Sequence, residues 1–155
     1  MQLSFRPSAF RFLAFLAFVA SLAVASPSMA QRMVSIASKE VNMRTGPGTG
    51  YGTDWTLGHG YPLKVIGRQG KWLKVSDFEN DKGWVYGPLT GSTPMHIVKV
   101  KVANMRSQPT MDSRIVGKVA YGNVLKTLER RESWVKVQRE GGLRGWIAKR
   151  LLWGW

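Results

Sequence analysis

Few side chains in this 155-residue chain could perform acid–base or nucleophilic chemistry. It holds two histidines, His59 and His96, and no cysteine, which excludes a thiolate nucleophile, a thiolate metal site and a disulfide. A Ser/His/Asp arrangement would need one of these histidines as its base, and a paired-carboxylate hydrolase would need two acids held in a cleft. Asp77, Glu79 and Asp81 fall instead in one apparent loop. We therefore expect a protein that is not an enzyme and that uses no cofactor or metal.

Aromatic side chains offer a binding chemistry, because their rings stack on sugar faces and on prolines while Tyr and Trp keep a polar group. The aromatic candidates for ligand binding are Tyr51, Trp55, Trp72, Tyr86 and Trp134. The same residues could instead fill a core, lie singly on the surface or contact a neighbouring domain. For Trp84 and Trp146, which lie between apolar residues, we expect the core.

Basic side chains are the third candidate group. The chain has 23 Lys and Arg against 9 Asp and Glu, a formal net charge of +14, and the part after residue 93 holds 13 of the basic residues and 4 of the acidic ones. A content of 44% hydrophobic and 11% aromatic residues excludes a disordered polycation. Arg130, Arg131 and Arg144 are candidate contacts for an anionic surface or an acidic partner. Solvated strand faces are the alternative, but the net charge of +9 after residue 93 exceeds what solubility needs.

Residues 1–30 have the order of a secretory signal. Arg6 and Arg11 precede an apolar run over residues 12–25, and Ser28 and Ala30 lie where a signal peptidase reads small side chains. A second cleavage site a few residues earlier is also open. The alternative is a membrane anchor, which needs about 20 strongly apolar residues. We expect cleavage, a periplasmic or secreted protein, and no transmembrane span after cleavage.

The remaining chain repeats itself at an offset of 62 residues. Asn-Met-Arg at residues 42–44 recurs at 104–106, Trp72 recurs as Trp134, and 14 of 48 aligned positions are identical without a gap. Two copies of about 60 residues are too few for a solenoid but suffice for two small domains. We predict domains at residues 33–90 and 95–155, joined by a linker at 91–94.

Each copy has the pattern of β-strands rather than helices. Short runs of β-forming residues are separated by turn signals rich in glycine, and residues 96–102 alternate apolar and basic side chains as a single strand would. The other predicted strands cover residues 63–66, 72–75, 83–86, 124–128, 134–137 and 145–148. Closely spaced short strands favour an all-β fold of small closed barrels, which leave no exposed edges.

The motifs of both copies resemble those of bacterial SH3-like domains. In the first copy, the segment from Asn42 to Tyr51 resembles the family's N-x-R motif followed by a Gly-Pro turn and an aromatic residue. Trp-x-Lys-Val at residues 72–75 and 134–137, and Gly-Trp-Val or Gly-Trp-Ile at 83–85 and 145–147, are similar to its later signatures. The second copy departs from the pattern by lacking the glycines that match Gly46 and Gly48.

This resemblance implies two tandem SH3-like barrels of five or six strands after a cleaved signal peptide. It also implies binding to peptidoglycan, peptides or protein partners outside the cytoplasm. We therefore expect an exported, non-catalytic protein of the cell envelope that recognises cell-wall peptidoglycan or an envelope protein. Two alternatives stay open: a general polyanion binder acting on acidic lipid or, less in keeping with export, on nucleic acid, and an activator of a cell-wall hydrolase.

Overall fold

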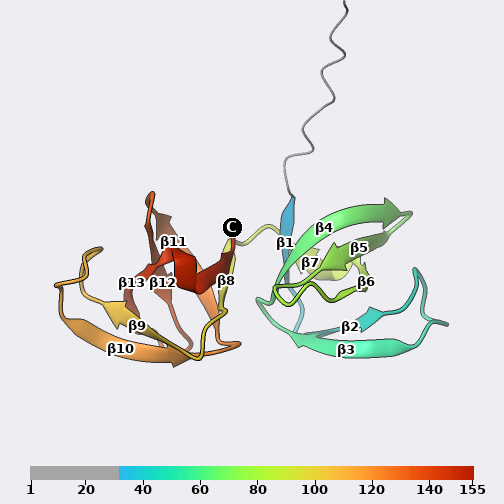
Figure 1. The fold of residues 1–155 in the computed structure, drawn as a ribbon. Coiled ribbons are helices and arrows are strands. Elements are labelled where there is room, and N and C mark those ends of the chain that lie inside the picture. The colour runs from blue at the N-terminus through green and yellow to red at the C-terminus, as the bar shows by residue number, and fades with distance from the viewer. Residues whose placement is uncertain (1–31) are drawn as a thin grey trace, which may run out of the picture.

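The structure, a computed structural model, describes residues 32–155, so the expected signal peptide lies outside the described residues. The described part forms two seven-stranded antiparallel sheets, one from each sequence copy (Figure 1). The only helical elements in residues 32–155 are two short 3-10 turns, and no helix there is long and apolar enough to cross a membrane. The prediction of an all-β fold is confirmed.

The first sheet has the strand order β3-β2-β6-β5-β4-β1-β7. Its elements are β1 (Met33–Ile36), β2 (Glu40–Arg44), β3 (Thr53–Gly58), β4 (Pro62–Gln69), β5 (Trp72–Ser76), β6 (Lys82–Tyr86), the 3-10 turn η1 (Gly87–Leu89) and β7 (Thr90–Gly91). The second sheet has the equivalent order β10-β9-β13-β12-β11-β8-β14. Its elements are β8 (Met95–Val98), β9 (Val102–Arg106), β10 (Ile115–Ala120), β11 (Val124–Arg130), β12 (Trp134–Gln138), β13 (Arg144–Ala148), η2 (Lys149–Leu151) and β14 (Leu152–Gly154).

The two sheets also share their irregularities. The pairing register shifts between Val65 and Gly67 in β4, and again between Thr127 and Glu129 in β11. These positions are related by the 62-residue offset of the sequence repeat. Such bulges bend a strand and increase its twist, so the repeat reproduces the curvature of the sheet as well as its strand order.

Each domain has its own core, made of aliphatic and methionine side chains from the inward face of its strands. The first core consists of Val34, Ile36, Val41, Met43, Leu57, Leu63, Leu73, Val75 and Val85. The second consists of Val98, Ala103, Met105, Val119, Leu125, Val135, Val137, Ile147 and Leu152. The offset relates most members of one core to members of the other, for example Met43 to Met105 and Leu63 to Leu125.

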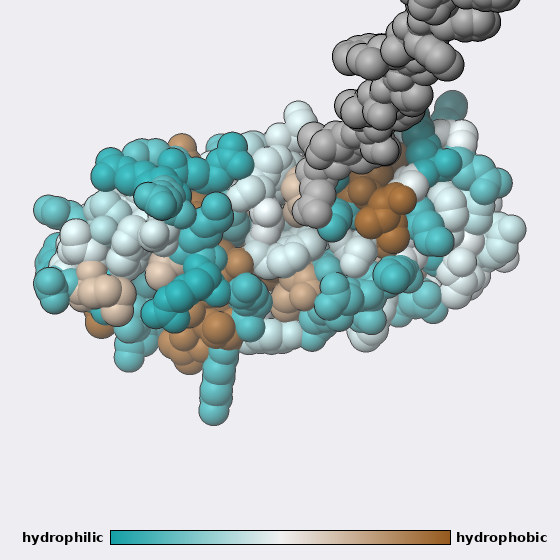
Figure 2. Space-filling model, turned by 45° about the horizontal axis from the view of Figure 1, so that its top comes forward, coloured by the Kyte–Doolittle hydropathy of each residue, from teal (hydrophilic) through white to brown (hydrophobic). Residues whose placement is uncertain are grey.

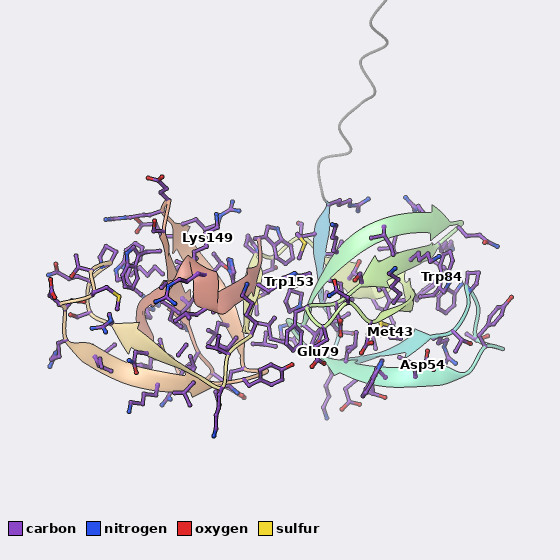
Figure 3. All side chains as sticks on the ribbon, in the orientation of Figure 1. Met43, Asp54, Glu79, Trp84, Lys149 and Trp153 are labelled. Carbon is purple, nitrogen blue, oxygen red and sulfur yellow. The ribbon has the colours of Figure 1, made fainter. Side chains whose placement is uncertain are left out.

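The expectation of a core position is wrong for Trp84, whereas Trp146 is buried, at 5% exposed, as expected. Successive strand residues point to opposite faces, and Val85 and Ile147 are the neighbours that point inward. Trp84 lies on the outer face, half-buried, with the Lys74 ammonium 5.9 Å from its ring centre (Figure 3). Trp146 is buried on the outer face under basic side chains.

Two predicted segment boundaries also differ from the structure. Residues 96–102 were predicted as one strand, but the chain turns between β8 and β9, where the Lys99 N–H donates to the Leu151 carbonyl. Val102 is consequently 53% exposed rather than aligned with buried Val98. In the predicted linker 91–94, Gly91 pairs with Ser35 and belongs to β7. Pairing with strands distant in the sequence therefore decides both boundaries.

Candidate functional site

A groove of about 580 Å³ opens on the first domain beside the loop between β2 and β3. We call it the first groove; it is lined by Glu40, Val41, Asn42, Arg44, Gly48, Thr49, Trp72, Tyr86 and Leu89. Its wall combines a strand, a loop and the 3-10 turn η1. Its volume falls within the about 300–1,000 Å³ typical of small-ligand sites.

Two aromatic rings form one side of the first groove. Trp72 begins β5 and Tyr86 ends β6, and the two residues are directly paired across these strands. Their ring centres lie 5.4 Å apart with a tilt of 58°. Gly70, at φ +56°, makes the tight turn that brings β4 back into β5 just before Trp72. Both side chains are half-buried, so their free surfaces are available to a ligand.

The loop that forms the opposite side of the groove is held by Arg44. Its guanidinium donates to the carbonyls of Tyr51, at 2.8 Å, and Thr49, at 3.3 Å. In the second domain, Arg106 donates to the carbonyl of Ser113 at 2.8 Å. The arginine of the N-x-R motif therefore fixes the shape of this loop in both copies.

The second domain has a groove of about 750 Å³ that shares three lining positions with the first groove through the offset, at Met111, Trp134 and Ala148. We call it the second groove; it is lined by Lys99, Met111, Glu132, Ser133, Trp134, Ala148, Lys149, Arg150 and Leu152. Trp134 corresponds to Trp72 through the sequence offset and begins β12 as Trp72 begins β5. The structure thus brings Trp72 and Tyr86 together in one groove and places Trp134 in the other.

The other aromatic candidates, Tyr51 and Trp55, line neither groove. Tyr51 is 51% exposed, and its ring packs against Gly46 so closely that a Cβ there would overlap it. Trp55 is 54% exposed and lies on β3, at the edge of the first sheet. Tyr51 therefore supports the groove loop, while Trp55 presents an isolated aromatic surface.

The three basic candidates lie in the second domain, Arg130 and Arg144 on strands and Arg131 just after β11, and they differ in their contacts. Arg131 donates to Glu129 at 2.9 Å and covers the Trp146 ring at 4.6 Å. Arg144 donates to the side-chain oxygen of Gln138 at 2.9 Å. Arg130 is exposed. Hydrophilic side chains cover much of the second domain on the face shown in Figure 2, at the left, with small hydrophobic areas between them.

Neither histidine hydrogen-bonds a carboxylate within residues 32–155, and only His96 lies beside a hydroxyl. His59 places Nδ1 3.1 Å from the carbonyl oxygen of Ala37. His96 is buried, and its Nδ1 lies 2.7 Å from the Thr127 hydroxyl. Burial lowers the pKa of His96 to about 4, with the charges of Arg130 and Lys149 acting in the same direction.

The acidic residues of the loop after β5 come together, as their spacing suggested. Carboxylate oxygens of Asp77, Glu79 and Asp81 lie within 4.8 Å of one another. Asp77 is buried and accepts the backbone N–H groups of Glu79 and Asp81, both at 2.9 Å, and the Tyr61 hydroxyl at 3.2 Å. Burial raises the pKa of Asp77, against the effect of these N–H donors. Asp77 thus fixes its own loop.

The same loop makes a contact between the domains that the sequence did not indicate. The Tyr121 hydroxyl of the second domain donates to Glu79 of the first, and the Tyr121 ring lies 5.4 Å from that of Phe78. Phe78 also packs near Tyr61, at 6.3 Å between ring centres. The offset equates Phe78 and Glu79 with Glu140 and Gly141, so this contact uses residues on which the two copies differ.

Comparison with known proteins identifies both domains. Residues 37–90 and residues 101–152 each match a family described as Bacterial SH3 domain, and together they cover about two thirds of the chain. The resemblance stated from the sequence motifs is confirmed.

The chain is similar to curated proteins named as cell wall amidases. It is 25% identical over 134 residues to the protein of Bacillus subtilis named as the N-acetylmuramoyl-L-alanine amidase YrvJ, covering 79% of this chain and 26% of that protein. It is 37% identical over 51 residues to the protein of Staphylococcus aureus named as the cell wall amidase LytH, covering 32% of this chain and 18% of that protein. The chain thus spans about a quarter or less of these relatives.

Solved structures with a similar arrangement of strands include NlpC1 from Trichomonas vaginalis, at 16% identity and a TM-score of 0.37, covering 83% of this chain and 47% of that one. An NlpC/P60 family protein from Bacillus cereus matches at 14% identity and a TM-score of 0.37, covering 80% and 56%. These values are too low to transfer a function.

The prediction that the protein is not an enzyme is contradicted by these comparisons. It rested on the scarcity of histidine and cysteine, whereas the curated relatives are named as amidases. The counts of histidine and cysteine alone therefore do not distinguish this chain from proteins named as cell wall amidases.

Proposed function

Because this chain belongs to the bacterial SH3 domain family and carries two such domains in tandem, we propose that it binds the peptidoglycan of the cell envelope through the first groove. The observation that carries the proposal is the pair of Trp72 and Tyr86 on one side of that groove. Such rings stack on sugar and peptide surfaces. The amidase names of the relatives support a cell-wall-related role.

The tandem arrangement supports retention on a polymer. Trp134 lines a second groove at the equivalent position, so one molecule presents two sites to a repeating ligand. Linking two sites converts the second binding event into an intramolecular one and raises avidity by about 10²–10⁴-fold when both can engage. Weak contacts at each groove are then sufficient for useful retention.

Export completes the proposal. Residues 1–30 carry the features of a cleavable secretory signal, which delivers the protein to the periplasm or the exterior, where peptidoglycan is accessible. Trp72, Tyr86 and Trp134 are the groove residues in this proposal. Tyr51 and the three arginines at 130, 131 and 144 are candidates for contacts at the margins of the bound polymer, whereas Trp55, which lines neither groove, is not among the proposed contacts.

Co-sedimentation with purified sacculi tests the proposal. We expect the purified protein to pellet with sacculi at about 0.15 M salt and to remain in solution without them. Equal recovery in both pellets would remove peptidoglycan as the ligand. The same mixtures are assayed for soluble muropeptides, because the relatives are named as amidases, and release by the protein alone would assign hydrolysis to it as well.

A further inference from the structure

The two grooves share three positions related by the offset, and they differ in chemistry. Trp134 retains the indole of Trp72, whereas Ala148 stands where the first groove has Tyr86. Lys149 and Arg150 begin η2 and line the second groove. Their counterparts begin η1 and lie outside the first groove, in a neighbouring hollow whose basic residues are Arg32, Arg68 and Lys71. The second groove therefore has one aromatic ring fewer than the first groove and two basic side chains from η2.

The cations of the second groove are available to a ligand. Lys99, Lys149 and Arg150 are exposed, and none of them forms an ion pair or a side-chain hydrogen bond within residues 32–155. The Lys149 backbone is fixed by its N–H bond to the Ser133 carbonyl, at 2.9 Å. Figure 3 shows Lys149 on the second domain, away from the contact between the domains.

The first domain cannot reproduce this arrangement by a simple substitution. A Cβ on Gly87, the counterpart of Lys149, would lie 2.9 Å from the Lys71 carbonyl oxygen and 3.3 Å from the Leu73 side chain. The Lys71 carbonyl, just before β5, therefore closes that position to a side chain.

We propose that the second groove binds a short acidic peptide of the wall, with its carboxylates at Lys99, Lys149 and Arg150 and its backbone against Trp134. The proposal rests on the proposed function for the choice of polymer. Ammonium and guanidinium groups form strong charge-assisted hydrogen bonds with carboxylates. Trp134, Ala148 and Leu152 supply an apolar surface for the rest of the peptide.

Glu132 favours a peptide over a polymer of phosphates. This exposed carboxylate lines the same groove as the three cations. It would repel a chain that carries only negative charge, whereas a peptide can offer it an amine or an amide N–H. The groove thus matches a ligand with several carboxylates and one basic group.

The test compares the tripeptide L-Ala-γ-D-Glu-meso-diaminopimelate with its carboxyl-amidated form, by titration into the purified protein. We expect the free acid to bind about tenfold more tightly than the amide and to shift the indole signal of Trp134. The double variant Lys149→Gln/Arg150→Gln is expected to lose that preference. The variant Arg114→Gln/Lys118→Gln removes the same charge from exposed positions outside the groove and is expected to keep it.

Three results would overturn the inference: equal affinity for the two peptides, an equal loss in the control variant, or a glycerol-phosphate oligomer that binds the groove more tightly than the free tripeptide. Sacculus binding by the same proteins separates this inference from the proposed function. Peptide preference without sacculus binding supports the inference and contradicts the proposed function. Sacculus binding without peptide preference contradicts the inference alone.

Discussion

The ring of Tyr121, in the second domain, lies 5.4 Å from the ring of Phe78, in the first, at an angle of 56°. Tilted aromatic pairs at this separation are favourable, and the Tyr121 hydroxyl adds a hydrogen bond to Glu79. Ser35 also donates to the carbonyl of Thr93, in the connection between the domains, at 2.9 Å. These contacts hold the two domains, and with them the two grooves, at one relative orientation.

The first prediction concerns this orientation. Tyr121→Ala removes both the ring contact with Phe78 and the hydrogen bond to Glu79 but leaves the Ser35–Thr93 bond and the contacts of β4 with β8 and β14. We therefore expect the two domains to move more relative to each other without separating. NMR relaxation would then show shorter rotational correlation times for both domains. Tyr51→Ala, at an exposed position outside this contact, is expected to leave them unchanged. Unchanged tumbling in Tyr121→Ala would contradict a role for this contact.

The second prediction is a pH dependence of stability from His96. Burial depresses its pKa from 6.5 to about 4 in the folded protein, so the unfolded chain binds more protons between these values. Stability is therefore complete above about pH 6.5 and decreases as the pH falls towards 4, by about 2 kcal/mol between pH 7.5 and pH 5. Denaturant unfolding at these two pH values measures the change.

His96→Gln provides the control for this pH dependence. It removes the titrating group, so the difference in unfolding free energy between pH 7.5 and pH 5 is expected to shrink by most of that amount. The Thr127 hydroxyl lies 2.7 Å from the imidazole, and the glutamine amide replaces the imidazole as its hydrogen-bond partner. An equal pH dependence in the wild type and the variant would show that other groups are responsible.

The third prediction tests the packing of the first core. A Cβ at Gly83 would lie 2.5 Å from Met43 Cγ and 3.1 Å from the Arg44 carbonyl oxygen. Gly83→Ala is therefore expected to destabilise the first domain by about 1–3 kcal/mol through overpacking. Gly50→Ala meets no atom within 4 Å and serves as the matched control. Comparable unfolding midpoints for the two variants would contradict the packing described for β6.

The fold could be predicted because the repeat and the period-two alternation of apolar residues can both be identified in the sequence alone. Runs such as residues 72–75 and 134–137 form strands in both domains as expected. Trp84 does not lie in the core because the alternation along β6 points Val85 inward instead, whereas Trp146 is buried as expected. The run 96–102 was misjudged because pairing with distant strands, rather than alternation, divides it into β8 and β9.

The candidate site was only partly predictable. Trp72, Tyr86 and Trp134 were identified, and the repeat already assigns Trp72 and Trp134 to different domains. The meeting of Trp72 with Tyr86 depends on the register of β5 and β6, which a single sequence does not display. Lys149 and Arg150 belong to the basic stretch of the second copy, and comparison with Gly87 and Pro88 across the offset could have marked them. No repeat argument would have found the contact of Phe78 with Tyr121, because it uses residues on which the copies differ.

The fourth prediction separates wall recognition from general polyanion binding. Arg131 and Arg144 are engaged by Glu129 and Gln138, which leaves fewer free cations than the charge of the domain suggests. We expect sacculus binding to weaken less than about tenfold between 50 and 200 mM salt, whereas neutralising six to ten phosphates would cost about 10³–10⁵-fold. A steep salt dependence that disappears on charge reversal of Arg130, Arg131 and Arg144 would favour the polyanion alternative.

The most direct test of groove-mediated wall binding is a binding isotherm on purified sacculi for wild type, Trp72→Ala and Trp55→Ala. Trp72 lines the first groove against Tyr86, whereas the exposed Trp55 lies on β3 outside both grooves. Losing a central aromatic contact typically costs about 2 kcal/mol or more, so we predict at least about tenfold weaker binding for Trp72→Ala and little change for Trp55→Ala. Equal affinities for wild type and Trp72→Ala would contradict the account.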